Sequence, residues 1–223
     1  MTGTTMRGGD RRLSTLGVLV VVSGFALAPG RAEGQVGGLA GQGVAAVVST
    51  TAGAQQFAVA ALPSSGGMAD SEQESVAVPN TLSAKGLASI ATGQVDQTLV
   101  SATTTAEATN VNILNGLITA QAVLAVATSY ANGVAATSES NGSTLLGLVI
   151  NGVSYGDVSP AANTQVTLPG VGHVVFNEQI SSGDGVHNAG LTVNMIHVYL
   201  TNPVLGTPTG DIMVATAKSA ASL

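Results

Sequence analysis

The segment TTTAEATNVNILNGLITAQAVLAVATS, residues 103–129, decides the fold, because it holds two strand-like runs around an Asn-Gly pair. The second run alternates at period two, which is the spacing of side chains on one face of a strand. Its apolar positions are Ile118, Ala120, Ala122, Leu124 and Val126. In the first run, residues 103–114, threonine and valine favour a pleated sheet. With Asn115-Gly116 between the runs, the segment predicts a β-hairpin.

Further strands are predicted after this hairpin. They are separated by Asn-Gly and Pro-Gly turns and by a loop with Pro and Gly at 203–210. The predicted strands cover residues 145–150, 153–155, 164–168, 173–179, 191–200 and 211–217. Turn signals at intervals of about ten residues, without alternation of strands and helices, favour an antiparallel β-sandwich. A β-solenoid is the alternative fold.

The region before Ala102 gives weaker signals. Ala-rich windows at 44–49 and 57–62 fit helix and strand templates about equally. The glycines around them disfavour long helices, since an interior glycine costs about 1 kcal/mol relative to alanine. We therefore predict strands in both windows. Residues 63–79 are predicted to form an exposed loop, because they combine a Ser-Ser-Gly-Gly run with an acidic triplet.

Residues 1–32 have the layout of a secretory signal peptide. The basic residues at its start are Arg7, Arg11 and Arg12. They precede an apolar run at 13–28 that is shorter than the ~20 residues of a membrane-spanning helix. Gly30 and Ala32 occupy the two small-residue positions before a cut, so we expect cleavage after Ala32. The mature chain, residues 33–223, is then expected to form a single all-β domain with no transmembrane span.

The expected mature chain is acidic and has no cysteine. Loss of residues 1–32 leaves two lysines against eleven acidic residues, a net charge of −9. Such a surface, with no arginine, repels nucleic acid and anionic lipid, which excludes nucleic-acid binding. Without cysteine there is no disulfide framework and no lipid-modified cysteine, which fits an exported bacterial protein. The acidic residues are scattered apart from the triplet Asp70, Glu72 and Glu74, which we interpret as part of a solvated loop.

Five phrases in the second half of the chain carry a family resemblance. They are NVNILNGLITAQAV (110–123), LLGLVINGVS (145–154), NTQVTLPGVGHVVFNEQ (163–179), LTVNMIHVYL (191–200) and DIMVATAKSA (211–220). Together they resemble the choice-of-anchor P family of bacterial exported proteins over about residues 105–220. The resemblance implies an exported, surface-associated domain without an assigned activity. The chain shows no LPxTG-type sorting signal and no C-terminal apolar span with a basic tail, so the resemblance implies no particular anchor.

The three histidines are the candidate metal ligands. None of His173, His187 and His197 has a second ligand at the short fixed spacing of a zinc site. Strict alternation also places His173 and Glu178 on opposite faces of one strand. We therefore predict no metal site and no cofactor. His197 is interpreted as a half-buried sheet residue with one hydrogen bond, and His187 as part of a loop at 181–190.

Glu178 is the candidate catalytic acid. Under strict alternation it continues the face of Val174 and Phe176, where a carboxylate is costly unless it is paired or lies at the wet end of the strand. We therefore expect the strand to end here, with Asn177, Glu178 and Gln179 capping backbone groups at the sheet rim. Catalysis would need a second carboxylate or a histidine beside Glu178, which the sequence does not place. No catalytic residue is predicted.

These observations predict an exported, non-catalytic β-protein of the cell surface or extracellular matrix. Sheets with exposed edges can add strands from neighbouring copies, so we expect self-association. The alternative is a monomeric binding module for a glycan or another surface protein, with Tyr130, Tyr155 and Tyr199 as stacking groups. A hydrolase built on Glu178 and the histidines ranks third.

Overall fold

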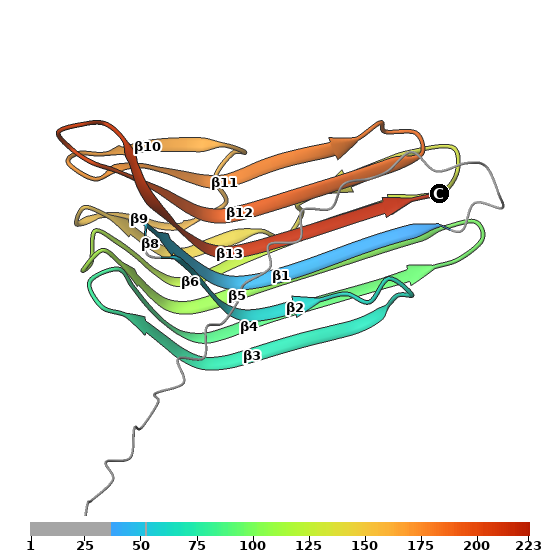
Figure 1. Ribbon diagram of the computed structural model, residues 1–223, viewed down its shortest axis with the longest axis horizontal. Helices are drawn as coiled ribbons and strands as arrows, with labels where there is room; N and C mark the ends of the chain where they lie inside the picture. The colour runs from blue at the N-terminus through green and yellow to red at the C-terminus, as the bar shows by residue number, and fades with distance from the viewer. Residues whose placement is uncertain (1–36, 52) are drawn as a thin grey trace, which may run out of the picture. The chain divides into compact units, whose positions relative to one another are not determined.

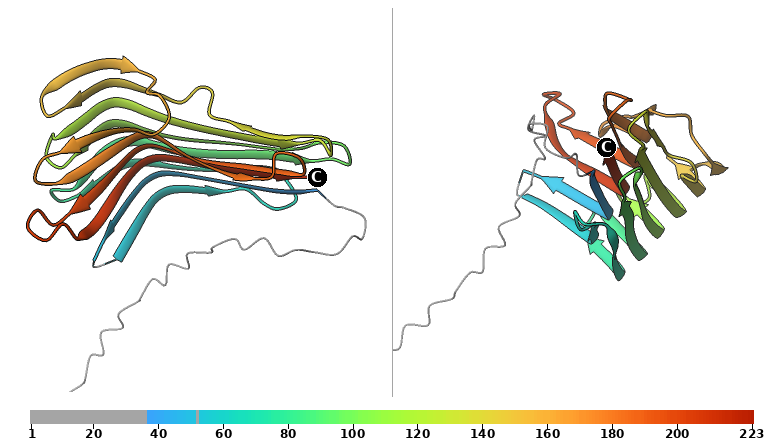
Figure 2. Two further views of the ribbon diagram at one scale, coloured as in Figure 1. Left: turned by 90° about the horizontal axis from the view of Figure 1, so that it is seen from above. Right: turned by 90° about the vertical axis from the view of Figure 1, so that its right-hand side faces the viewer.

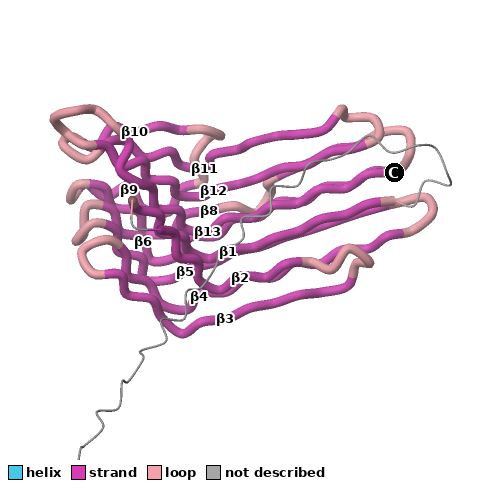
Figure 3. The backbone as a smooth tube through the Cα atoms, viewed as in Figure 1, coloured by secondary structure: helices cyan, strands magenta, loops and turns pink. Residues whose placement is uncertain are grey.

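The computed structural model describes residues 37–51 and 53–223, and all the regular elements in them are β-strands (Figures 1 and 3). The predicted signal peptide and its cleavage site after Ala32 lie outside the described residues. Since the described part of the chain has no helix, it offers none that is long and apolar enough to cross a membrane. The strands are β1 Gly38–Thr50, β2 Gly53–Ala61, β3 Gly67–Val78, β4 Leu82–Val95, β5 Val100–Ile113, β6 Ile118–Ala131, β7 Ala136–Glu139, β8 Thr144–Ile150, β9 Val153–Val158, β10 Thr164–Leu168, β11 Gly172–Gly183, β12 Asn188–Thr201 and β13 Pro208–Ser222.

The strands form two antiparallel sheets that pack face to face. Sheet A has the order β10-β11-β12-β13-β1-β2 and lies in front in Figure 1. Sheet B has the order β3-β4-β5-β6-β8-β9, and the short β7 also pairs with β6. The prediction of an antiparallel β-sandwich is confirmed. The solenoid alternative is wrong, because neighbouring strands run antiparallel in two separate sheets.

Local turn chemistry predicted most of the strands correctly. The hairpin at 103–129 is β5 and β6, joined around Asn115-Gly116, with Thr103 opposite Thr128. The six strands expected after it are all present as β8 to β13, and β11, β12 and β13 extend beyond the predicted bounds. The Ala-rich windows at 44–49 and 57–62 fall largely in β1 and β2.

The loop predicted at 63–79 is wrong. Gly67–Val78 forms β3, an edge strand of sheet B that pairs along its length with β4. The acidic triplet therefore lies on an edge strand, with Asp70 and Glu72 exposed. Charged side chains on an edge discourage pairing with another chain, which gives the triplet a physical role that a loop would not need.

Both sheets bend across the middle of their strands, and sheet A lies on the inner side of the bend (Figure 2). Along a line across sheet A the pairing skips one residue in each of β11, β12, β13, β1 and β2. The skipped residues are Asn177, Met195, Ala215, Ala45 and Ala58. Three of them, Asn177, Ala215 and Ala58, have positive φ, as do Gly86, Asn110 and Gly147 in sheet B. In sheet A the skipped residues lie opposite one another and the register is unchanged. In sheet B the register shifts beside Gly86 and Gly147, as it does at a β-bulge.

The bend shifts the alternation of side chains by one residue. In β12, Leu191 and Val193 face the core on one side of the bend, whereas Ile196 and Val198 face it on the other. Asn194 and His197 therefore share the outer face of sheet A, although they are three residues apart.

The same shift occurs in β6 of sheet B. Ile118 and Ala120 are buried before the bend, and Val123 and Ala125 after it. The prediction of a single unbroken face from residue 118 to 126 is therefore wrong.

The core is thick on one side of the bend and thin on the other. The short arm, which holds residues 196–201 of β12, packs large side chains such as Phe176, Ile196 and Ile212. The long arm, which ends near the C-terminus (Figure 1), is packed mainly with glycine, alanine and serine. There the hydroxyls of Ser129 and Ser219 form a 2.8 Å hydrogen bond between the two sheets. The sheets of the long arm are therefore within direct hydrogen-bonding reach of each other.

Candidate functional site

The segment Asn177-Glu178-Gln179 lies within β11 at the bend. The prediction that the strand ends there is wrong, because β11 continues to Gly183. Asn177 has a φ of 48°, and its side-chain amide donates to the backbone oxygen of Pro160 at 2.8 Å. The left-handed backbone at Asn177 interrupts the alternation of β11, so Glu178 lies on the outer face of sheet A while Val174 and Phe176 stay in the core. The expectation that Glu178 continues their face is therefore also wrong.

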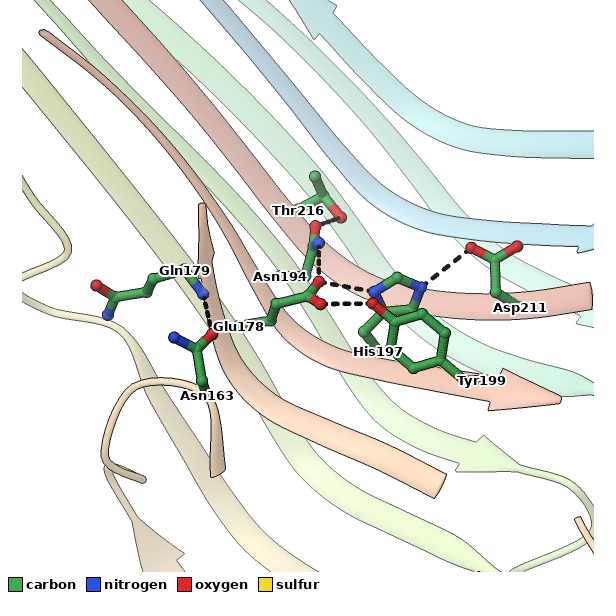
Figure 4. Close-up of polar contacts among 8 residues, drawn as sticks. All are labelled: Asn163, Glu178, Gln179, Asn194, His197, Tyr199, Asp211 and Thr216. Atoms are coloured by element: carbon green, nitrogen blue, oxygen red, sulfur yellow. Dashed lines mark hydrogen bonds and ion pairs between the residues drawn. The ribbon is translucent and has the colours of Figure 1, made fainter. Parts of the chain in front are cut away.

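Gln179 ties β11 to its surroundings. Its Nε2 donates to Ser140 Oγ at 2.7 Å and to Asn177 Oδ1 at 3.0 Å. Its backbone N–H donates to Asn163 Oδ1 at 2.8 Å (Figure 4). Asn163 belongs to the connection between β9 and β10, so Gln179 fixes that connection to β11.

Six polar side chains meet on the inner side of the bend, on the outer face of sheet A (Figure 4). This polar cluster consists of Glu178, Asn194, His197, Tyr199, Asp211 and Thr216. They come from the neighbouring strands β11, β12 and β13. The register places Glu178 opposite Asn194, and Asn194 opposite Thr216. The cluster therefore links three strands at the point where the sheet bends.

Glu178 is the centre of the polar cluster, because its carboxylate has three partners. Asn194 Nδ2 donates to Oε2 at 2.7 Å, and His197 Nδ1 contacts the same oxygen at 2.7 Å. The Tyr199 hydroxyl donates to Oε1 at 2.5 Å. Desolvation by burial acts to raise the pKa of Glu178, but the hydrogen bonds from Tyr199, His197 and Asn194 outweigh it, so the pKa is lowered.

His197 bridges two carboxylates. Its Nε2 lies 3.1 Å from Asp211 Oδ2, while Nδ1 is engaged by Glu178. Burial acts to lower the pKa of His197, but the hydrogen bonds and negative charges of Asp211 and Glu178 raise it overall. The hydrogen bond with His197 in turn holds the pKa of Asp211 below its usual value. The arrangement favours an imidazolium that donates one N–H to each carboxylate.

Tyr199 stacks with two histidine rings. The ring centroids of His173 and Tyr199 are 4.7 Å apart, and those of His197 and Tyr199 are 3.9 Å apart. His173 and Glu178 therefore both contact Tyr199 from the same face of β11. The prediction of opposite faces is wrong because the left-handed residue Asn177 interrupts the alternation between them. Burial and the bond to Glu178 raise the pKa of the Tyr199 hydroxyl. Tyr199 is therefore already engaged by two aromatic rings and by Glu178 within the chain.

His187 lies away from the polar cluster, in the turn between β11 and β12. Asp184 Oδ1 accepts the backbone N–H groups of Asn188, Val186 and His187 at 3.0, 2.8 and 2.7 Å. These bonds lower the pKa of Asp184 to about 2. The turn is shorter than the loop expected at 181–190, because β11 and β12 take up most of it.

The hydrogen bonds within the polar cluster occupy the groups that general-base catalysis would use. General-base catalysis needs an imidazole nitrogen that can take a proton from a nucleophile. Both nitrogens of His197 are held by carboxylates, and the Tyr199 hydroxyl is held by Glu178. Among the described residues, no group of three or more His, Cys, Asp or Glu side chains could hold a metal ion. The bonds instead join β11, β12 and β13 across the bend.

The sequence interpretation missed Asn194, Asp211 and Thr216 and did not connect Tyr199 with Glu178. A signal was present in LTVNMIHVYL, where the two most polar side chains of an apolar strand stand three positions apart. A spacing of three puts both on one face only if the alternation of the strand is interrupted between them. His197 also has two hydrogen-bond partners where one was expected.

The polar cluster predicts a stability optimum in mildly acidic solution. The pKa of Glu178 is lowered from 4.5, so its carboxylate stabilises the folded state above about pH 4.5, and this is lost as the pH falls through the lowered value. The pKa of His197 is raised from 6.5, so the imidazolium stabilises below about pH 6.5, and this is lost as the pH rises through the raised value. We expect the melting temperature to fall on both sides of this window.

The measurement is thermal unfolding between pH 3 and 9 for the native chain, His197→Gln and the control His187→Gln. The His197→Gln variant should lose the decline on the alkaline side, and His187→Gln should keep it. An identical profile for His197→Gln and the native chain would contradict the assignment.

No protein-family model, no curated protein and no solved structure matches this chain. The resemblance to the choice-of-anchor P family stays a prediction.

Proposed function

We propose that this chain is an exported, non-catalytic structural protein of the bacterial cell surface or extracellular matrix, which assembles with copies of itself through the edges of its sheets. The observation that carries the proposal is the set of uncovered edges. β2 and β10 end sheet A and β3 and β9 end sheet B, and within the described residues none of them has a strand partner on its outer side. Unpaired N–H and C=O groups along such an edge are a template for a strand from another chain.

The absence of a catalytic role is supported by the saturation of the polar cluster. Each nitrogen of His197 and each oxygen of the Glu178 carboxylate already has a partner within the chain. A substrate would have to break these bonds before it could use the groups. Their arrangement supports a role in fixing the bend.

Export and surface location are supported by the N-terminal sequence and by composition. The basic residues and apolar run of residues 1–32 have the order of a secretory signal. The resemblance over about residues 105–220 points to the same location. We expect a bacterial host to secrete the protein. N-terminal sequencing of the released protein should then begin at Glu33.

Self-association is tested by light scattering coupled to size exclusion over a hundredfold range of concentration. The protein is purified after expression of the full 223-residue chain. We expect the mass to increase with concentration and ordered species to appear in negative-stain images. A strict monomer at every concentration would contradict the proposal.

A monomeric binding module is the second candidate, because two tyrosines are open to a ligand. Tyr130 is 40% exposed on β6 and Tyr155 is 53% exposed on β9, whereas Tyr199 is already stacked. Retention of the native chain on an immobilised polysaccharide, lost in Tyr155→Ala, would favour this candidate. Equal retention of Tyr155→Ala and the native chain would count against it.

A further inference from the structure

The sandwich is open between its two sheets along β9 and β10. A groove of about 270 Å³ lies at this edge. Its apolar lining includes Leu148, Ile150, Tyr155, Val158, Val166 and Phe176. These residues come from β8 and β9 of sheet B and from β10 and β11 of sheet A. We name this region, with its two edge strands, the β9–β10 edge.

Apolar surface is exposed around this groove. Val153 and Tyr155 on β9 are 57% and 53% exposed, and Val166 at the centre of β10 is half-buried. Apolar side chains next to unpaired strand edges mark a surface that gains free energy when it is covered. A partner that adds a strand would cover both the backbone edge and the groove.

The β9–β10 edge carries fewer charged residues than the opposite edge of the sandwich. At the opposite edge, β3 carries Asp70, Glu72 and Glu74. β10 has no charged residue, and the single acidic side chain of β9, Asp157, accepts the backbone N–H of Gly147 at 2.9 Å. Two copies of an acidic protein repel each other least where their surfaces are uncharged. β10 also contains no lysine and no proline, the residues that commonly guard an edge.

We propose that the β9–β10 edge is the surface through which two copies of this chain associate, with β10 of one copy pairing antiparallel to β10 of the other. This inference rests on the proposed structural function and names its interface. An antiparallel pair of identical strands has two-fold symmetry. Val166 is the central residue of Thr164–Leu168, so pairing centred there places both Val166 side chains at the axis. The two apolar grooves then lie beside the same interface.

The test compares two variants, each of which introduces one negative charge on a different edge strand of sheet A. Val166→Glu places a carboxylate from each copy at the proposed axis, where the two repel each other. Val59→Glu is the matched control, because Val59 lies on β2, the other edge strand of the same sheet, and is 37% exposed. Sedimentation velocity on the full-length expression product should show the dimer dissociation constant rising at least about tenfold for Val166→Glu and unchanged for Val59→Glu.

A second pair of variants keeps the test decisive if Val166→Glu fails to fold. Tyr155→Glu changes the groove from the β9 side, and Tyr130→Glu makes the same change at a tyrosine on β6. The proposal expects weaker association for Tyr155→Glu alone. Circular dichroism of each variant serves as the control that its β-structure is retained.

Other outcomes overturn the proposal in distinguishable ways. Association that survives both Val166→Glu and Tyr155→Glu would place the interface elsewhere and leave the structural function standing. A native chain that stays monomeric at all concentrations would remove both the interface and the proposed function. A monomer that binds the apolar dye anilinonaphthalene sulfonate, with binding lost in Val166→Glu, would make the groove a site for small apolar ligands instead.

Discussion

Replacing Glu178 by alanine is expected to lower the free energy of unfolding by about 3 kcal/mol. The change removes the acceptor of three hydrogen bonds and leaves Asn194, His197 and the Tyr199 hydroxyl without their partner on a largely buried surface. It also removes one of the two negative charges that hold the imidazolium of His197. Breaking a buried pair from one side costs about 3–5 kcal/mol, and the partial exposure of Glu178 places the effect at the lower end.

The measurement is thermal and denaturant unfolding at pH 5.5, where the polar cluster is expected to contribute most. For a chain of this size, 3 kcal/mol corresponds to a fall of about 6–12 °C in melting temperature. Glu72→Ala is the control, because Glu72 is exposed on β3, and its effect should stay within about 0.5 kcal/mol. Equal losses in the two variants would mean that the polar cluster does not stabilise the bend.

Glu178→Gln separates the charge from the shape of the side chain. Glutamine keeps an oxygen that can accept from Asn194 and His197, but it carries no negative charge. We expect a smaller loss of stability than in Glu178→Ala, together with a weaker decline on the alkaline side of the pH profile. That combination would not arise if Glu178 acted only by filling space.

The elements that sequence predicts well here are those that depend on neighbours in the chain. Asn115-Gly116 and Asn151-Gly152 each specify a turn through the conformations of two residues, and the strands on either side follow. β3 and β4 were missed for a related reason. Small and polar residues make up most of both strands, and neither apolar alternation nor β-branched residues distinguish them from a loop.

The bend was not predictable from the period of the side chains, because it breaks that period. A strict alternation carried through Asn177 puts Glu178 in the core and separates it from His173. One left-handed residue reverses both conclusions. The polar cluster then follows from the register between successive strands, which sets the contact of Glu178 with His197 and of His197 with Asp211. Such a register is a property of the whole sheet.

The glycines of β1 are another feature whose structural role is not visible in the sequence. In the sequence they indicate only that a long helix is disfavoured. In the structure an added Cβ at Gly43 would lie 2.8 Å from the backbone oxygen of Thr105 and 2.9 Å from Ser89 Cβ, both in sheet B. Gly41 is similar, with 2.9 Å to Thr104 Oγ1. The absence of a side chain at Gly41 and Gly43 is therefore what allows the two sheets of the long arm to approach.

Gly43→Val is accordingly expected to destabilise the chain by about 3 kcal/mol, at the upper end of the usual cost of overpacking. The Thr105 oxygen belongs to the β4–β5–β6 ladder, so it cannot withdraw without disturbing backbone pairing on both sides. The sheets would have to separate locally, which also weakens the hydrogen bond between Ser129 and Ser219.

Ala54→Val provides the control for Gly43→Val, because it adds a β-branched side chain at an exposed position of the neighbouring strand β2. Denaturant unfolding should show Ala54→Val within about 0.5 kcal/mol of the native chain. The loss of free energy of unfolding in Gly43→Ala should lie between those of Ala54→Val and Gly43→Val, since one methyl group already contacts the Thr105 backbone oxygen. If Gly43→Val unfolded at the same denaturant concentration as Ala54→Val, the sheets could move apart without cost, and the close approach would not be what selects glycine. A graded loss from alanine to valine is the result that steric contact between the sheets requires, because each added carbon pushes further against a backbone that its own ladder holds in place.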